Sequence, residues 1–239
     1  MSKPRAPQNT QTPPEEASLT IVGIGASAGG LTALKAFFAH VPEDSGLAFV
    51  VVVHLSPDHE SHLSNVLQPH VRLPVQQVTE TVPLEANQVY VIPPGCNLDT
   101  IDTHLRLSEL EEERRDRAPI DHFFRTLARV YDGHSVGIIL SGTGSDGTSG
   151  IREVKGAGGL TVVQEPDEAQ YDGMPRSAIA TGLTDLVLPV AEMPDAIIHF
   201  VRTQPRVTAP EEGEPDADER QLLHRIFARV KHQTGWSRR

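Results

Sequence analysis

Three polar residues of the types that carry out acyl transfer each follow an apolar stretch of the chain. Ser27 follows the apolar run 19–26, His54 follows the β-branched run 48–53, and Asp146 lies in a glycine-rich loop after the run 136–140. A serine hydroxyl, an imidazole and a carboxylate are the nucleophile, general base and orienting acid of serine hydrolases. His54 would take the proton of Ser27, while Asp146 would hold the other ring nitrogen protonated. These residue types therefore predict a serine hydrolase.

Such a hydrolase also needs donors for the oxyanion that forms during the reaction. Backbone N–H groups in the two glycine-rich loops can supply them. The candidates for contacts with the oxyanion or the substrate are Ala28, Thr143, Gly144 and Arg176.

Each residue also has another interpretation. The sequence Gly-Ile-Gly-Ala-Ser-Ala at 23–28 matches the variant of the dinucleotide-binding fingerprint that ends in alanine. That fingerprint requires an acidic residue at the end of the second strand, where this chain has His-Leu-Ser-Pro at 54–57. No lysine follows the glycines, which excludes a phosphate-binding P-loop. Asp146 is also suited to cap the helix that follows it.

The elements that must position these residues alternate between strands and helices. This alternation predicts an α/β fold with a doubly wound, mostly parallel sheet and helices on both faces. The segments 89–95 and 104–107 predict a small antiparallel hairpin at one edge. Ligands bind outside the carboxyl ends of parallel strands, so Ser27, His54 and Asp146 are expected at one edge of the sheet. The other predicted strands are 160–163 and 186–188, and the predicted helices are 31–40, 61–67, 121–131, 148–156 and 195–201.

Composition narrows the function and the location. The formal net charge of -11 over 239 residues argues against nucleic acid as a partner. The single cysteine, Cys96, cannot form an internal disulfide and fits a reducing compartment. No signal peptide is recognisable, and no apolar run approaches the roughly 20 residues that a membrane span needs. We therefore expect a cytoplasmic protein that does not insert into a membrane and uses no metal or cofactor.

The chain divides into four segments. Residues 1–18 predict a flexible lead-in, 19–203 an α/β catalytic domain, and 204–219 an acidic, proline-rich linker. Residues 220–239 predict an amphipathic helix. Its apolar stripe consists of Leu222, Leu223, Ile226, Phe227 and Val230.

Five motifs together resemble the catalytic domain of the chemotaxis receptor methylesterases, the CheB-type protein-glutamate methylesterase/glutaminase family. The resemblance covers about 18–203. The motifs are Gly-Ala-Ser-Ala-Gly-Gly at 25–30, His-Leu-Ser-Pro at 54–57, Tyr-Val-Ile-Pro-Pro-Gly at 90–95, Ser-Gly-Thr-Gly-Ser-Asp-Gly at 141–147 and Gly-Met-Pro-Arg at 173–176.

The resemblance implies that Ser27 is the nucleophile, His54 the base and Asp146 the orienting acid. It implies hydrolysis of glutamate γ-methyl esters on chemoreceptors and deamidation of certain receptor glutamines. The sequence departs from the family at Ala28, where relatives often have Thr, and at Thr143, where many have Met. A non-catalytic module that only docks on a signalling partner is the alternative function. The segment 222–236 resembles the first helix of the receptor methyltransferase, so it is either a terminal helix or the start of a methyltransferase domain in the same chain.

Overall fold

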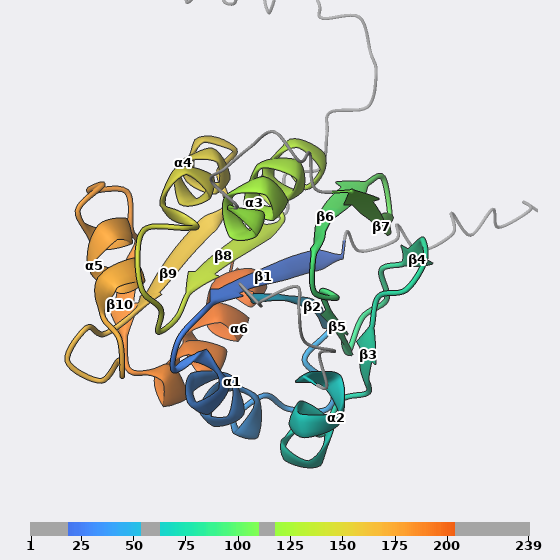
Figure 1. Ribbon diagram of the computed structural model, residues 1–239, viewed down its shortest axis with the longest axis horizontal. Coiled ribbons are helices and arrows are strands. Elements are labelled where there is room, and N and C mark those ends of the chain that lie inside the picture. Colours follow the sequence, from blue (N-terminus) through green and yellow to red (C-terminus); the bar gives the residue numbers. More distant parts are fainter. Residues whose placement is uncertain (1–18, 54–62, 110–117, 204–239) are drawn as a thin grey trace, which may run out of the picture. The chain divides into compact units, whose positions relative to one another are not determined.

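The main sheet consists of parallel strands, with β1 at its centre (Figure 1). The computed structural model describes residues 19–53, 63–109 and 118–203, all of which belong to one unit that ends at Thr203. The sheet extends from β1 through β2 on one side and through β8 on the other, so the strand order reverses at β1. The strands in sheet order are β10 (Leu186–Leu188), β9 (Leu160–Gln164), β8 (Ser135–Ile139), β1 (Thr20–Ala26), β2 (Leu47–Val53), β5 (Gln88–Val91) and β3 (Val75–Gln77).

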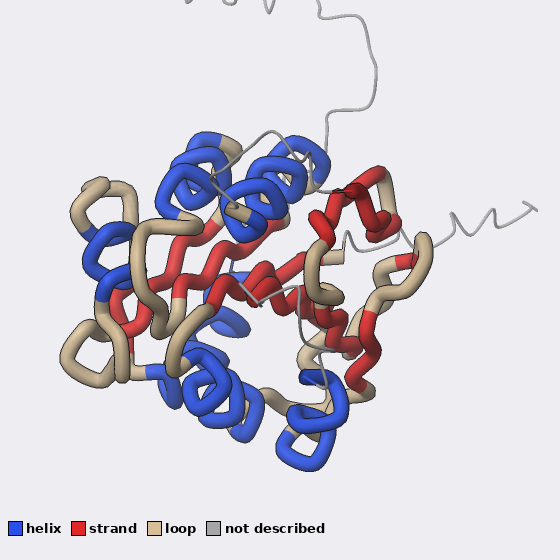
Figure 2. Tube along the Cα trace, viewed as in Figure 1, coloured by secondary structure: helices blue, strands red, loops and turns tan. Residues whose placement is uncertain are grey.

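Helices cover both faces of this sheet, as Figure 2 shows. One face packs against α1 (Gly30–Ala39), α2 (Leu63–Leu67), the short 3-10 helix η2 (Val190–Glu192) and α6 (Met193–Thr203). The 3-10 helix η1 (Gln68–His70) follows α2 directly. The other face packs against α3 (Pro119–Val130), α4 (Thr148–Gly156) and α5 (Gly173–Ile179). The predicted fold class, a doubly wound and mostly parallel α/β sheet, is confirmed.

A small second sheet lies beside α3 and packs into the same core as α3 and α4. It consists of β4 (Val82–Pro83), β7 (His104–Glu109) and β6 (Cys96–Ile101), with antiparallel pairing. The small antiparallel element was therefore predicted correctly, but the pairing of 89–95 with 104–107 was wrong. The segment 88–91 is β5, which lies between β2 and β3 in the parallel sheet. Its three buried residues suit a strand covered on both faces.

Alternate residues of β1 face opposite layers. Val22 and Ile24 belong to the core under α1 and α6, and Ile21 belongs to the core under α3. Gly23 and Gly25 also face α3: a Cβ at Gly23 would lie 2.9 Å from the rings of Phe123 and Phe124. These glycines therefore lie in the strand and let α3 pack directly on it. The dinucleotide-binding interpretation required them in a phosphate turn, and the structure gives them this packing role instead.

We predict that Gly25→Ala destabilises the protein. Its Cβ would lie 2.4 Å from Cγ2 of Ile120, a branched side chain with 0 % exposure, so α3 would have to shift. Overpacking of this kind typically costs about 1–3 kcal/mol. Gly156→Ala is the matched control, because a Cβ there meets nothing within 4 Å and the residue is helical. The control should be neutral or up to about 1 kcal/mol more stable. Urea unfolding of both variants checks the prediction, and equal midpoints would contradict it.

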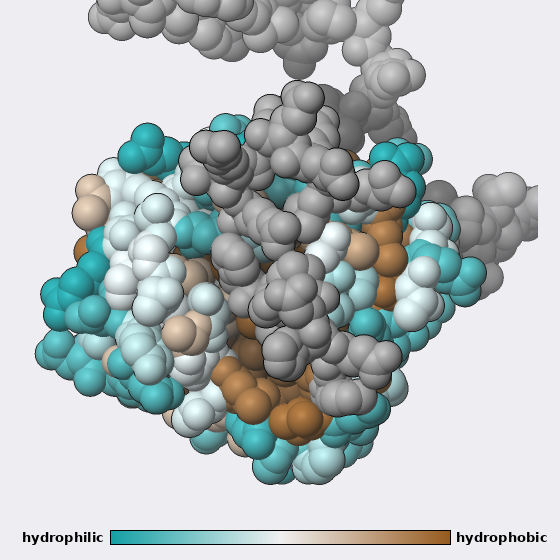
Figure 3. All heavy atoms as spheres, in the orientation of Figure 1, coloured by the Kyte–Doolittle hydropathy of each residue, from teal (hydrophilic) through white to brown (hydrophobic). Residues whose placement is uncertain are grey.

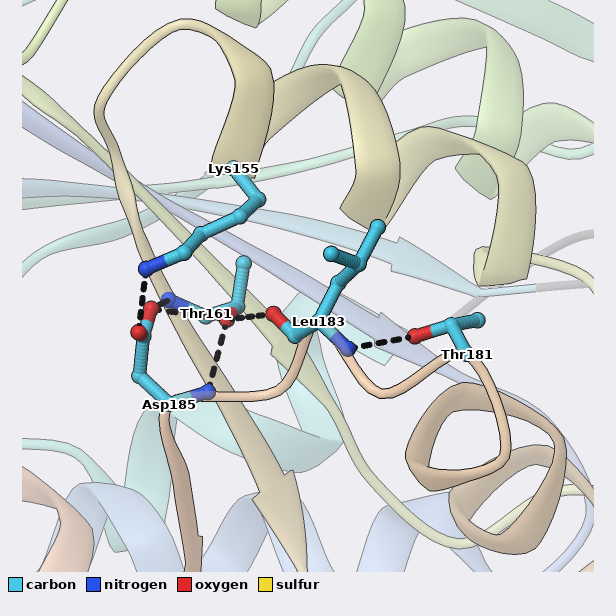
Figure 4. A network of polar contacts seen from close by, with 5 residues as sticks. All are labelled: Lys155, Thr161, Thr181, Leu183 and Asp185. Atoms are coloured by element: carbon cyan, nitrogen blue, oxygen red, sulfur yellow. Dashed lines mark hydrogen bonds and ion pairs between the residues drawn. The ribbon is translucent and has the colours of Figure 1, made fainter.

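A polar network joins β9, the last residue but one of α4 and the turn before β10 (Figure 4). The Asp185 carboxylate is ion-paired with Lys155 and accepts hydrogen bonds from the amide of Thr161 at 3.0 Å and its hydroxyl at 2.9 Å. The Thr161 hydroxyl also lies 2.8 Å from the carbonyl oxygen of Leu183. In the same turn, the Leu183 amide donates to the Thr181 hydroxyl at 3.1 Å. Partial burial works to raise the pKa of Asp185, but the Lys155 and Thr161 hydrogen bonds outweigh it and lower that pKa below 3.8.

This lowered pKa predicts a contribution to acid stability. A carboxyl with a depressed folded-state pKa stabilises the fold above its unfolded value, here 3.8, and loses that contribution as the pH falls through the folded-state pKa. Asp185→Asn should therefore be less stable than wild type at pH 6, and the difference should shrink below pH ~4. Denaturant midpoints of the two proteins measured from pH 6 to 2.5 test this. A difference that does not change over this range would contradict it.

None of the helices among the described residues has the length and apolar composition needed to cross a lipid bilayer.

Candidate active site

Ser27 lies directly after β1, at the point where the strand order reverses. Strands β1 and β2 end level with each other, since Ala26 and Val53 are partners in register. On the other side, Gly25 pairs with Ile139, the last residue of β8. Crevices at such a reversal are the usual ligand sites of open parallel sheets. The half-buried Ser27 is therefore at the expected edge.

The turn after β1 is held by backbone hydrogen bonds. The Ser27 amide donates to the Ser141 carbonyl oxygen at 3.0 Å, and the Gly30 amide donates to the Ser27 carbonyl oxygen at 2.9 Å. Gly29 has φ of 73°, and a Cβ there would lie 2.6 Å from Oγ of Ser141 and 2.8 Å from Cβ of Gln170. Only glycine fits this position, for conformation and for space. The turn then leads into α1.

Asp146 lies in the loop between β8 and α4 and binds the amino end of α3. Its two carboxylate oxygens accept hydrogen bonds from the amides of Ile120 at 3.2 Å and Asp121 at 3.0 Å. A negative charge at a helix N-terminus is favourable because the free N–H groups point toward it. The expectation that Asp146 caps the following helix was wrong, since the helix it caps is α3.

Asp121, in the first turn of α3, binds the amino end of α4. Its carboxylate accepts a hydrogen bond from the Gly150 amide, in the first turn of α4, at 2.6 Å. Burial raises the pKa of Asp121, and hydrogen bonds from backbone amides of 147–150 oppose that increase in part. The carboxylates of Asp146 and Asp121 thus tie the amino ends of α3 and α4 together. Asp121 is a residue of the candidate site that the sequence motifs do not include. The sequence does indicate that Asp121 lies in the first turn of a helix, because it follows Pro-Ile directly at the start of a predicted helix.

The candidate oxyanion donors lie in two loops that touch. A Cβ on Gly142 would be 3.0 Å from Cβ of Ser27, so the loop after β8 lies directly against the nucleophile turn. Thr143 and Gly144 follow in that loop, and both are exposed. Gly144 has φ of 81°. Ala28 is in the turn itself, where its carbonyl oxygen accepts a hydrogen bond from the Ser141 hydroxyl at 2.9 Å.

Arg176 is on α5, whose second residue is tied to the same loop: the Met174 amide donates to the Gly142 carbonyl oxygen at 2.9 Å. The guanidinium pairs with Asp172 at 2.5 Å and with Asp167 at 3.8 Å. The hydrogen bond and charge of Asp172 raise the pKa of Arg176, and those of Arg176 lower the pKa of Asp172. Arg176 is 61 % exposed, and a guanidinium has five N–H donors, so it can contact a ligand while these carboxylates remain bound.

His54, the predicted base, lies outside the described residues. Among those that are described, no group of three or more His, Cys, Asp or Glu side chains is arranged to hold a metal ion.

The surface beside the site includes apolar side chains. In Figure 3, hydrophobic colour gathers where Figure 1 places α1 and α2. Leu31, in the first turn of α1, and Val66, in α2, are each 39 % exposed.

The protein has a doubly wound α/β fold with a serine at the reversal of strand order. The loop beside this serine carries an aspartate that caps α3. These features define an α/β protein with a candidate hydrolase site. The CheB methylesterase family model matches residues 22–197, so the chain belongs to the CheB methylesterase family.

The chain is also similar to individual proteins, one of which carries the methylesterase name. The chain is 34% identical over 190 residues to protein-glutamate methylesterase/protein-glutamine glutaminase 2 of Anaeromyxobacter dehalogenans, a match covering 80% of this chain and 56% of that protein. It is 39% identical over 145 residues to an uncharacterized 104.1 kDa protein in the hypE 3' region of Rhodobacter capsulatus, covering 61% of this chain and 15% of that protein. Both matches span only part of the relative's length.

The structure of the Thermotoga maritima CheB methylesterase catalytic domain has the same fold. The TM-score is 0.70 at 28% identity, covering 77% of this chain and all of that domain.

Proposed function

We propose that this chain is a protein-glutamate methylesterase that hydrolyses glutamate γ-methyl esters on chemoreceptor-type signalling proteins. Family membership supports the reaction class. The observation that carries the proposal is the position of Ser27, one residue past the central strand and held by Ser141 from the loop that contains Asp146.

The proposed mechanism uses a covalent acyl intermediate. The Ser27 hydroxyl attacks the ester carbonyl carbon while His54 takes its proton, and methanol leaves with that proton. Water then attacks the acyl group on Ser27, which yields the free glutamate and restores the hydroxyl. Asp146 orients the imidazole and stabilises its charged form. The amides of Ala28, Thr143 and Gly144 are the proposed oxyanion donors, and the departures Ala28 and Thr143 preserve this capacity because every residue except proline has an N–H.

The same steps, with ammonia as leaving group, hydrolyse a glutamine side chain. The name of the Anaeromyxobacter relative includes this glutaminase activity. The proposal further includes a methylated chemoreceptor or a similar signalling protein as partner, and a cytoplasmic location. Fusion to a methyltransferase domain after residue 219 stays a prediction, because 204–239 lies outside the described residues.

Release of methanol from a methyl-labelled receptor by the purified chain tests the proposal. We expect turnover by wild type and covalent labelling of Ser27 by a fluorophosphonate probe. A chain that binds the receptor but releases no methanol and takes up no probe would instead be the non-catalytic signalling module.

A further inference from the structure

Ser141 uses all of its hydrogen-bonding groups at the edge of the candidate site. Its amide donates to Oε1 of Gln164 at 2.8 Å, and its carbonyl oxygen accepts from the Ser27 amide at 3.0 Å. Its hydroxyl accepts from the Tyr171 amide at 3.0 Å and donates to the Ala28 carbonyl oxygen at 2.9 Å, the nearer of two acceptors, since the Tyr171 carbonyl oxygen lies at 3.3 Å. Ser141 is only 1 % exposed, so water does not compete for these contacts. It joins the nucleophile turn, the end of β9 and the loop before α5.

Two of the three peptide groups around the nucleophile are thus fixed by Ser141. The peptide before Ser27 is held through its N–H, and the peptide after Ala28 is held through its carbonyl oxygen. The peptide between them is fixed through the Ser27 carbonyl oxygen, which accepts the Gly30 amide at 2.9 Å. Because a peptide group is planar and trans, fixing that carbonyl oxygen also fixes the opposite direction of the Ala28 N–H.

Ser141 is itself held in place by buried polar groups. Gln164, with 3 % exposure, accepts the Ser141 amide and lies with its Nε2 3.3 Å from Oε2 of Glu168. The same Glu168 oxygen accepts the Val190 amide at 2.8 Å. Gln164 therefore holds the backbone of Ser141, and Glu168 holds Gln164 in turn.

We propose that the Ser141 hydroxyl is a positioning group for ester hydrolysis. It holds the Ala28 carbonyl oxygen and so keeps in place the turn in which the Gly30 hydrogen bond to the Ser27 carbonyl oxygen directs the Ala28 N–H toward the developing oxyanion. The inference rests on the proposed function and adds a residue that does not itself touch the substrate. A preorganised donor stabilises charge that develops in the transition state, so its loss lowers kcat more than it raises KM. Complete loss of one oxyanion donor typically lowers kcat about 10²–10³-fold. Loosening a donor that remains present should lower kcat by about 10–100-fold.

Ser141→Ala is the principal variant, and Ser135→Ala is its matched control. Both serines are 1 % exposed; Ser135 is the first residue of β8, and Ser141 lies two residues after its last residue, Ile139. The Ser135 hydroxyl has no hydrogen-bond partner in the described part of the chain. Ser141→Cys is a second variant, of nearly the same shape but with a weak donor, and it covers the case in which the alanine variant does not fold.

The experiment measures kcat and KM on methylated receptor well below the thermal unfolding midpoint of each variant. We expect Ser141→Ala and Ser141→Cys to lose about 10–100-fold in kcat with KM within about twofold of wild type, and Ser135→Ala to match wild type. The proposal is overturned if the Ser141 variants keep the kcat of Ser135→Ala, or if a rise in KM accounts for the whole loss. Wild type that releases no methanol would overturn the proposed function instead, and fluorophosphonate labelling rates of the same variants would then test Ser141 separately.

Discussion

Ser27→Ala is expected to abolish methyl ester hydrolysis while the protein remains folded. Loss of a nucleophile that acts with a base and an orienting acid lowers the rate by about 10⁴–10⁶-fold. The fold should survive, because the contacts that hold this turn, to Ser141 and Gly30, use the backbone of Ser27, which alanine also has. The residue is half-buried, and removing one hydroxyl there leaves the glycine contacts on either side unchanged.

Methanol release and thermal unfolding, measured on the same preparation, check this prediction. Ser145→Ala is the control, since Ser145 is an exposed serine in the loop beside the nucleophile turn. The control should keep wild-type turnover. If Ser27→Ala retained a tenth of wild-type turnover, Ser27 would not be the nucleophile that we propose. Unfolding at a much lower temperature would contradict the prediction that the fold survives.

The second large effect is expected at Asp146, where two variants separate catalysis from helix capping. Asn keeps only one of the two acceptor oxygens that bind the Ile120 and Asp121 amides, so Asp146→Asn should lose some stability but less than Asp146→Ala. As an orienting acid, however, the amide presents the wrong hydrogen-bonding pattern to an imidazole, and turnover should fall about 10⁴-fold. Asp146→Ala should lose turnover and also about 0.5–2 kcal/mol, because the Ile120 and Asp121 amides lose their acceptor.

The result distinguishes two roles for one carboxylate. Turnover of the methylated receptor and urea unfolding are measured for wild type and for both variants. Wild-type turnover in Asp146→Asn, with the larger loss of stability in Asp146→Ala, would make Asp146 a helix cap and nothing more. The triad would then need a different orienting acid.

Hydrogen bonds among the described residues hold both Ser27 and Asp146 in place. Asp146 is held by two hydrogen bonds to α3, and Ser27 by the loop that carries Asp146. Their proposed partner His54 lies outside the described residues, so the roles of all three as a triad rest on the variants above. The level ends of β1 and β2, at Ala26 and Val53, are the structural support for including His54.

The sequence by itself determined the fold class and the edge of the sheet on which the site lies. Runs such as 48–53 are apolar on both faces, and a strand needs this only when a layer of structure covers each face. Parallel strands bring their carboxyl ends to one edge of the sheet. Short-range pattern is sufficient for this inference, because it depends on the residues within each strand and directly after it. The candidate residues Ser27 and Asp146 were found in this way, and the structure has both at that edge.

Only the tertiary structure decided which segments pair and what individual residues contact. The partner of β7 is β6, and the partner of Asp146 is the amino end of α3 across 25 residues of chain. Gly23 and Gly25 resembled a phosphate turn, yet they lie in β1 because the rings and branched side chains of α3 pack there. Ser141 is the first polar residue after an apolar run and the first residue of the motif at 141–147, but neither feature indicates its contacts. Its role depends on three loops meeting in space, and contacts between residues distant in sequence are set by packing, which no local pattern encodes.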